Sequence, residues 1–461
     1  MCDVLFISER PLWPLDQGFR VHGIALARAL THLDQSVRLA SLQPTQHPDT
    51  PDDIRAMLTP WPTPTPNHIT QAEQAWQQGG YLTRTLRHKA AAHQALTSCD
   101  TAGLLPLLHQ LQPTHLIALG PHGPVFLQTA LSQSPHMISD HVWAPPTRTW
   151  YAADEPASFA LSCLRHEPPT RWPLRLRQAA VFATLQRTAA PAIQTVIGVS
   201  PTDTCRLQRL TRAPHALNLP NGVDPIRFPF RPPTPPGHPA LAGWSPDHSL
   251  AFWGNLAFEP NADAARFLLK RVWPKLIKQH PDAKLSLIGP NLPDALQRLT
   301  NQPGVTVTGH VPDLPALLHQ HALAVMPFRL GLGIKNKLLE AAALGLPIIA
   351  SPHAVRELTP PTHTPIPGGQ RPPVTPPQPW LLAKTPNQWL HQITHLWAHP
   401  TQATTLARTA HTWVRTHHDW PTQAQTLLHH LNRLTPPTHQ PDDMNSEVTE
   451  HSRPAQAAQA A

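Results

Sequence analysis

The segment from residue 322 to residue 350 constrains the fold of this chain more than any other. Ala322-Leu-Ala-Val-Met-Pro327 is a short apolar run, typical of a strand buried in a parallel sheet. A glycine-rich loop and an amphipathic helix follow, Gly345 is placed to end that helix, and residues 347–350 begin another apolar run. This order predicts an α/β fold whose ligands bind at the carboxyl ends of parallel strands.

The loop and the helix start that follows it combine a flexible backbone with charge. Gly331 and Gly333 let the backbone approach a ligand, and Lys335 and Lys337 add positive charge at a helix N-terminus. Glu340 lies one turn further on and could accept hydrogen bonds from ribose hydroxyls. The combination suits a nucleotide diphosphate-sugar. The alternative is an ordinary loop and helix, with Lys337 and Glu340 as a solvated pair that contributes roughly 0.2–0.5 kcal/mol.

Length and charge narrow the class of protein. With 461 residues the chain predicts two domains and tails, and its net charge of +8 fits phosphorylated substrates or an anionic membrane. Nucleic acid is not an expected partner, because the positive charge is scattered and no helix-turn-helix, zinc-finger or RNA-binding signature is present. Proline (59) and histidine (31) are so frequent that a single histidine carries little evidence.

The cysteines and the hydropathy pattern predict a soluble cytoplasmic protein. No Cys-x-x-Cys pair occurs among the four separate cysteines, which argues against a zinc site and a secreted disulfide framework: Cys2, Cys99, Cys163 and Cys205. The residues before the first expected strand are too few for a signal peptide, and no apolar run reaches membrane-spanning length.

The first half of the chain predicts one Rossmann-like sheet. Apolar runs at 4–8 and 35–41 flank a helix expected from Phe19 to Leu33, which makes a βαβ opening. Further strands are expected at 115–119, 137–139 and 196–199.

The second half repeats this plan. Expected strands lie at 250–253, 285–288, 305–308 and 322–326, with helices at 293–299 and 313–320 and a further helix for which Asn261 is the expected N-cap. Proline-rich residues 231–246 indicate an interdomain connection, and 359–379 indicate a surface loop. The expected division is 1–220, a connection at 221–248, a second domain at 249–412, a C-terminal helix at 413–435 and a disordered tail at 436–461.

Four motifs occur in a fixed order in the chain: Asn221-Gly-Val-Asp224, the segment 254–261, Gly309-His-Val-Pro-Asp313, and the segment 331–350. In this order the chain, over roughly residues 2–358, resembles family 4 of the GT-B glycosyltransferases, and within it the sugar transferases of exosortase and exopolysaccharide loci. The resemblance implies α/β GT-B architecture, with two Rossmann-like domains whose parallel sheets face an interdomain cleft. It also implies a last helix, at 420–434, that crosses back to the first domain.

The same resemblance implies a retaining transfer that needs no metal, and no Asp-x-Asp pair follows an expected strand. The expected catalytic residues are Lys335, Lys337 and His122, and the expected substrate-binding residues are Gly18, Asn255, Val311, Gly331, Gly333 and Glu340. The first glutamate of the family's helix motif falls on Leu332, and Asn255 and Glu259 replace the usual basic residues. Lys335 or Lys337 would then stabilise the departing diphosphate. Gly18 could equally be a turn glycine, His122 an ordinary histidine, and Asp140, a weaker candidate, a helix cap.

Several functions and partners remain open. Transfer of a sugar to a glycan or lipid-linked acceptor is the leading function, in exopolysaccharide or cell-envelope polysaccharide synthesis. A nucleotide-sugar 2-epimerase or a non-catalytic sugar-nucleotide-binding scaffold would use the same architecture. Residues 165–187 hold five arginines with Trp172 among them, which predicts either a helix resting on a membrane surface or a solvated basic helix.

Overall fold

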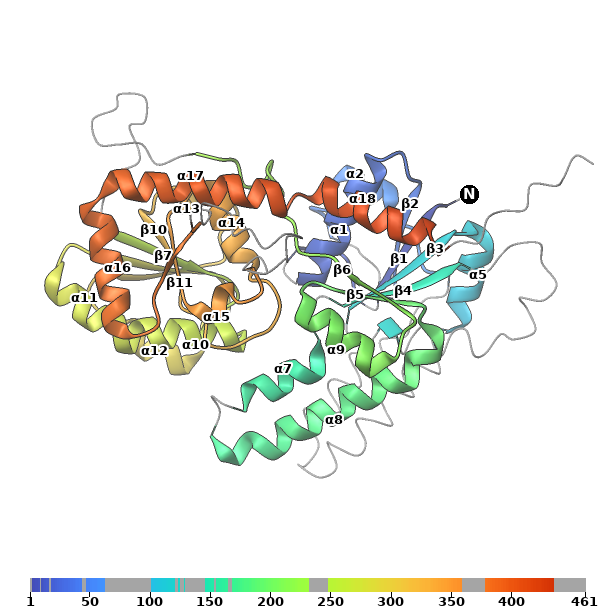
Figure 1. The fold of residues 1–461 in the computed structure, drawn as a ribbon, viewed down its shortest axis with the longest axis horizontal. Coiled ribbons are helices and arrows are strands. Elements are labelled where there is room, and N and C mark those ends of the chain that lie inside the picture. Colours follow the sequence, from blue (N-terminus) through green and yellow to red (C-terminus); the bar gives the residue numbers. More distant parts are fainter. Residues whose placement is uncertain are drawn as a thin grey trace, which may run out of the picture.

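The structure, a computed structural model, consists of two α/β domains placed side by side (Figure 1). It describes residues 2–8, 10–15, 18–43, 47–62, 101–120, 123–124, 128, 146–152, 155–164, 168–231, 248–358 and 378–434. The expected strand at 137–139, much of the proline-rich connection, most of the loop at 359–379 and the tail from 435 lie outside these residues.

The N-terminal sheet has six parallel strands in the order β2-β1-β3-β4-β5-β6. The strands are β1 (Val4–Ser8), β2 (Val37–Ser41), β3 (His115–Leu119), β4 (Thr147–Ala152), β5 (Thr195–Gly198) and β6 (His215–Asn218). The sequence analysis missed β4 and β6. Polar Thr147, Arg148 and Thr149 open β4 and hide its buried aromatic end, and β6 is a short, partly exposed edge strand.

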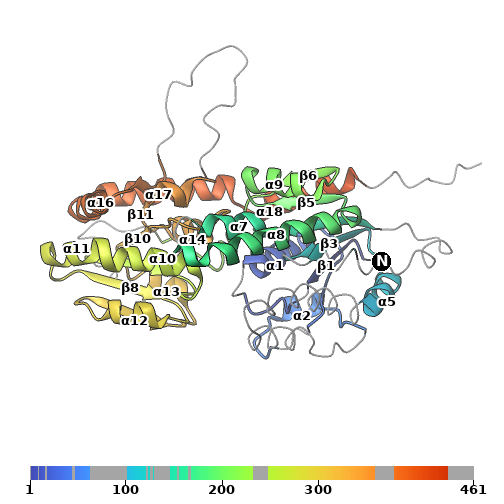
Figure 2. The ribbon, with the colours of Figure 1, turned by 90° about the horizontal axis from the view of Figure 1, so that it is seen from below.

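Helices cover both faces of this sheet. They are α1 (Gly18–Thr31), α2 (Asp52–Met57), α5 (Thr101–Leu111), α7 (Pro156–Cys163), the 3-10 turn η1 (Pro169–Arg171), α8 (Trp172–Ala189), the 3-10 turn η2 (Ala190–Ala192) and α9 (Pro201–Thr211). Together, α7, η1 and α8 form a hairpin that extends from the N-terminal domain toward the C-terminal domain (Figures 1 and 2).

The C-terminal sheet is also parallel, in the order β12-β11-β10-β7-β8-β9. Its strands are β7 (Ser249–Trp253), β8 (Lys284–Ile288), β9 (Val305–Gly309), β10 (Leu323–Met326), β11 (Ile348–Ala350) and β12 (Leu381–Leu382). A continuous apolar core joins the sheet to its helices. The expectation of two Rossmann-like domains with parallel sheets is therefore confirmed.

The helices of this domain begin and end close to the expected positions. They are α10 (Glu259–Phe267), the π-helical turn η4 (Leu268–Val272), α11 (Trp273–Gln279), α12 (Asp294–Thr300), α13 (Leu314–Leu318), α14 (Asn336–Leu344), α15 (Pro352–Val355), α16 (Pro386–Ala398) and α17 (Pro400–His417). Asn261 was expected to cap the helix that is now α10, and this was wrong. The helix begins two residues earlier with Pro260 in its first turn, and the Asn261 side chain instead donates to the Asn255 carbonyl.

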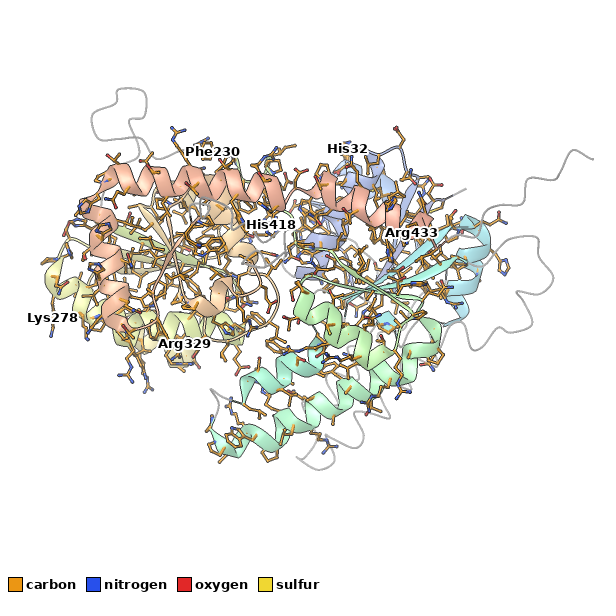
Figure 3. The ribbon with its side chains drawn as sticks, viewed as in Figure 1. His32, Phe230, Lys278, Arg329, His418 and Arg433 are labelled. Carbon is orange, nitrogen blue, oxygen red and sulfur yellow. The ribbon has the colours of Figure 1, made fainter. Side chains whose placement is uncertain are left out.

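A last helix, α18 (Trp420–Asn432), packs on the N-terminal domain and contributes Trp420 and Leu427 to that core. The helix before it, α17, continues to His417, so the crossing begins at 418–419 and not at 413. His418 fixes this point, because its Nδ1 lies 2.6 Å from the Asn221 carbonyl and its own carbonyl accepts from the Val223 amide. Figure 3 places His418 between the two domains. No helix among the described residues is long and apolar enough to cross a membrane.

Candidate active site

The strand order defines where a ligand can bind in each domain. In the C-terminal sheet β7 and β10 are neighbours, and the chain builds outward from them in opposite directions. Such a switch point opens a crevice at the carboxyl ends of the two strands. The loops after β7 and β10 contain the predicted Asn255 and the predicted glycine–lysine segment. In the N-terminal sheet the corresponding point lies between β1 and β3.

Lys337 lies against the loop that follows β7. Gly254 in that loop has φ +127°, and a Cβ built on it would stand 2.4 Å from Lys337 Cε and 2.7 Å from Lys337 Nζ. Only glycine tolerates both the backbone angle and this contact. The Lys337 ammonium therefore reaches the loop in which Asn255 stands where a basic residue was expected.

The environment of Lys337 favours its neutral form more than water does. Burial lowers the pKa of Lys337, and the nearby Glu340 carboxylate partly offsets this effect. The amine also lies 5.8 Å from the centroid of the Phe328 ring. An anion bound beside Lys337 would act in the same sense as Glu340 and favour the charged ammonium.

Lys335 folds back onto its own loop. Its Nζ donates to the Leu332 carbonyl at 2.6 Å and lies 3.3 Å from the Gly333 carbonyl. Gly331 and Gly333 both have positive φ, at +92° and +65°. The Leu332 side chain is buried. The Lys335 amine thus stabilises the loop, and Lys337 is the lysine that spans α14 and the loop after β7.

Glu340 is held by an indole from the neighbouring strand. Trp253, the last residue of β7, donates from Nε1 to Glu340 Oε2 at 2.7 Å. Because Glu340 lies one turn after Lys337 on α14, the contact brings the carboxylate to the carboxyl end of β7. Residues 331–340 and the loop after β7 therefore form one connected site.

The start of α14 is also bonded to α1 of the N-terminal domain and to the segment that follows that domain. Asn336 Oδ1 accepts from Asn221 Nδ2 at 2.6 Å, and Asn336 Nδ2 lies 3.4 Å from His22 Nε2. Burial lowers the pKa of His22 to about 4, so the ring is neutral at pH 7 and can accept this hydrogen bond. Gly18 lies one turn before His22, at the start of α1. No atom of the described residues comes within 4 Å of a Cβ built on Gly18.

The other predicted site residues have contacts that do not tie them to Lys337 and Glu340, or lie outside the described residues. Asn255 Oδ1 accepts from the Ala257 amide and orders the loop. Val311 follows β9 and packs its side chain on the C-terminal core. His122 and Asp140 lie outside the described residues, so their predicted roles stay predictions.

The sequence analysis did not single out four residues that contact the candidate site: Trp253, Asn336, His22 and His353. The Nε2 atom of His353 lies 2.9 Å from the Gly331 carbonyl oxygen. No pattern separates His22 or His353 from the other histidines of this chain. Trp253 ended a predicted strand, and only its contact with Glu340 reveals a role.

A group that could hold a metal ion lies elsewhere in the C-terminal domain. His248, His280 and Asp282 place ligand atoms within 4.8 Å of one another. His248 Nδ1 and Asp282 Oδ2 already share a hydrogen bond of 2.7 Å. The group lies at the amino ends of β7 and β8, whereas the Lys337 site lies at the carboxyl ends of β7 and β10. It therefore has no part in that site.

Solved structures define the class of fold. Sucrose-phosphate synthase from Thermosynechococcus elongatus superposes with a TM-score of 0.62 and 15% sequence identity, over 94% of this chain and 99% of the synthase chain. HepE from Anabaena, in complex with UDP and glucose, has a TM-score of 0.58 and 14% identity over 94% and 100%. WaaG, a glycosyltransferase involved in lipopolysaccharide biosynthesis, has a TM-score of 0.53 and 14% identity over 92% and 99%. The chain thus has the GT-B fold.

The match to a sequence family covers a smaller part of the chain than the matches to solved structures do. Residues 247–372, which include β7, β10 and α14, match the family described as "Glycosyl transferases group 1". This stretch contains the whole Lys337 and Glu340 site. No curated protein matches the chain.

Proposed function

We propose that this protein is a glycosyltransferase that moves a sugar from a nucleotide-diphosphate donor to a glycan or lipid-linked acceptor. The observation that carries the proposal is the placement of Lys337 and Glu340 one turn apart at the start of α14, against the loop after β7. The group 1 match covers this site, and HepE, which shares the fold, is described in complex with UDP and glucose.

Each group of the site has a role in this reaction. Helix α14 begins without a side-chain cap and without an acidic residue in its first turn, so its amides present positive potential to a diphosphate. The Lys337 ammonium stabilises the charge that grows on the diphosphate as the glycosidic bond breaks. Glu340, held by Trp253, accepts hydrogen bonds from the ribose hydroxyls.

The finer features of the proposal follow the family resemblance. We expect the transfer to retain the configuration of the sugar and to need no metal ion. We also expect the protein to act in exopolysaccharide or cell-envelope polysaccharide synthesis, at the inner face of the membrane. Leu332 cannot form the hydrogen bonds of the glutamate usual at this position. Sugar selection must therefore rest on other groups, and a scaffold without catalysis is the competing function.

A thermal-shift screen of UDP-, GDP-, ADP- and dTDP-sugars tests donor binding, because a ligand that binds only the folded protein raises its melting temperature. The donor that gives the largest shift is then followed for hydrolysis and transfer, with and without EDTA. We expect turnover that survives EDTA and falls in Lys337→Ala. Binding without turnover would favour the scaffold, and epimer formation would favour the 2-epimerase. Activity restored only by magnesium or manganese would contradict the role given to Lys337.

A further inference from the structure

Two histidines and an aspartate gather at the amino end of the C-terminal sheet. His248 directly precedes β7, and His280 and Asp282 belong to the turn between α11 and β8. Each of the three side chains offers one ligand atom, and these atoms lie within 4.8 Å of one another. We call these three residues the His248 cluster. It brings two segments of the chain together at the surface with three groups that can bind a metal ion.

The backbone of the C-terminal sheet sets the positions of the cluster. Strands β7 and β8 are parallel neighbours, in a register that pairs Ser249 with Lys284. The Lys284 amide donates to the His248 carbonyl at 2.8 Å, and the Ala283 amide donates to the His280 carbonyl at 3.0 Å. Because these hydrogen bonds belong to the sheet and to the turn that leads into it, the fold itself holds the cluster residues next to one another.

The two imidazole rings of the cluster are also ordered by their neighbours. The buried Trp397 ring lies 4.6 Å from the His248 ring and 5.3 Å from the His280 ring, between centroids. His248 Nδ1 and Asp282 Oδ2 share a hydrogen bond of 2.7 Å. A carboxylate that pairs with a histidine fixes the orientation of the imidazole, as it does in many metal sites. The cluster therefore loses little side-chain freedom when it binds an ion.

The donor set indicates which ion the cluster selects. Two imidazole nitrogens and one carboxylate oxygen suit Zn²⁺, whereas Mg²⁺ and Ca²⁺ prefer oxygen ligands alone. Zinc bonds of about 2.0–2.2 Å place the ligands of a tetrahedral ion roughly 3.4 Å apart. Atoms that already lie within 4.8 Å of one another need only a small movement to reach this spacing. The Asp282 side chain is free to make that movement, since it is 67% exposed.

We propose that His248, His280 and Asp282 bind one Zn²⁺ ion. The ion takes the place of the proton that His248 and Asp282 share, and water completes the coordination. It ties the start of β7 to the turn before β8, so it stabilises the C-terminal domain and takes no part in the chemistry at Lys337. The inference does not depend on the proposed function.

Isothermal titration calorimetry tests the site, with ZnCl₂ added to the full chain without a polyhistidine tag, after removal of metal by EDTA and dialysis. We expect one tightly bound Zn²⁺ ion per chain, and no such binding with MgCl₂ or CaCl₂. His280→Gln and Asp282→Asn should each weaken zinc binding at least about tenfold, because even the loss of a group that only orients a metal ligand costs that much. Zinc should raise the melting temperature of the wild type more than that of either variant.

His395→Gln/His399→Gln is the matched control. These two imidazoles also stack, at 4.4 Å between centroids, but belong to no group of three metal-binding side chains among the described residues. The control should bind zinc as the wild type does, and circular dichroism establishes that each variant is folded. Wild-type protein that binds no zinc, cluster variants that bind it equally well, or a control that loses it would overturn the inference. Zinc binding without any donor-induced thermal shift would keep the inference and count only against the proposed function.

Discussion

The Trp253 indole and the Glu340 carboxylate form a hydrogen bond of 2.7 Å that joins the end of β7 to α14. Trp253 is almost completely buried, so its ring cannot follow a moving carboxylate. One oxygen of Glu340 is thereby engaged, and within the part of the chain that the structure describes the other oxygen forms no hydrogen bond and can accept one from a ligand. This contact fixes the direction of the carboxylate in the protein alone, and such preorganisation would save ordering entropy when a ligand binds.

Trp253→Phe should weaken donor binding about 5- to 10-fold, because it removes one hydrogen bond to a charged group and leaves the ring in place. Isothermal titration calorimetry with the donor selected by thermal shift measures this change. Trp273→Phe is the control, since its buried indole donates to the Pro303 carbonyl on another part of the domain. Both variants should lower the melting temperature, and only Trp253→Phe should change the Kd. Equal Kd values in the two variants would refute the positioning role of Trp253.

Glu340→Gln and Lys337→Ala should separate binding from chemistry. On the proposed function Glu340 would contact ribose in the ground and transition states alike, so its variant should raise the Kd for the donor. Lys337 would meet charge that grows during the proposed reaction, so its variant should lower kcat roughly 10²-fold and change donor binding less. Steady-state kinetics and calorimetry on both variants measure the split. Unchanged kinetics in both would remove α14 from the active site.

Gly254→Ala should destabilise the C-terminal domain and lower activity. The new Cβ would meet the Lys337 side chain at 2.4 Å in a backbone conformation that alanine rarely adopts. We expect a loss of roughly 1–3 kcal/mol in the free energy of unfolding. Gly18→Ala is the matched control, because the space around that helix-start glycine is open among the described residues. A Gly254→Ala variant as stable as Gly18→Ala would contradict the Lys337 contact.

The free energy of unfolding should fall as the pH drops from about 6.5 toward 4. Burial lowers the pKa of His22 and of His418 to about 4, so both are neutral in the folded protein. The unfolded chain takes up protons near pH 6.5 and is stabilised by them, at up to roughly 1.4 kcal/mol per pH unit for each histidine. Urea denaturation at pH 7 and pH 5 measures the loss.

His22→Gln and His418→Asn should each reduce that pH dependence, because they remove one proton-binding group and keep a polar side chain. His32→Gln is the control, because His32 is exposed on the surface (Figure 3). If the pH dependence of the His22 and His418 variants matched that of His32→Gln, neither buried ring would be responsible.

Local patterns in the sequence were sufficient to predict most of the architecture. Apolar runs separated by glycine turns and amphipathic helices predicted β1, β3, β7, β8 and β10, since burial on both faces of a parallel sheet demands such runs. The same patterns placed Gly345 at the end of α14, where its φ of +81° confirms the helix stop. The segment 331–340 was recognised for the same reason: glycine, lysine and helix-start signals are all local.

Only the tertiary structure decided which of these residues act together. The sequence could not show which of Lys335 and Lys337 lies against the loop after β7, because both follow the same glycines. The Lys337 contact depends on Gly254, which lies 83 residues before Lys337 and is brought to it by the pairing of β7 with β10. Trp253 and Glu340 meet through the same pairing, and His22 and Asn336 meet because the start of α14 lies against α1 of the first domain. Contacts between residues this far apart in the chain have no local signature, since they arise from the packing of whole elements.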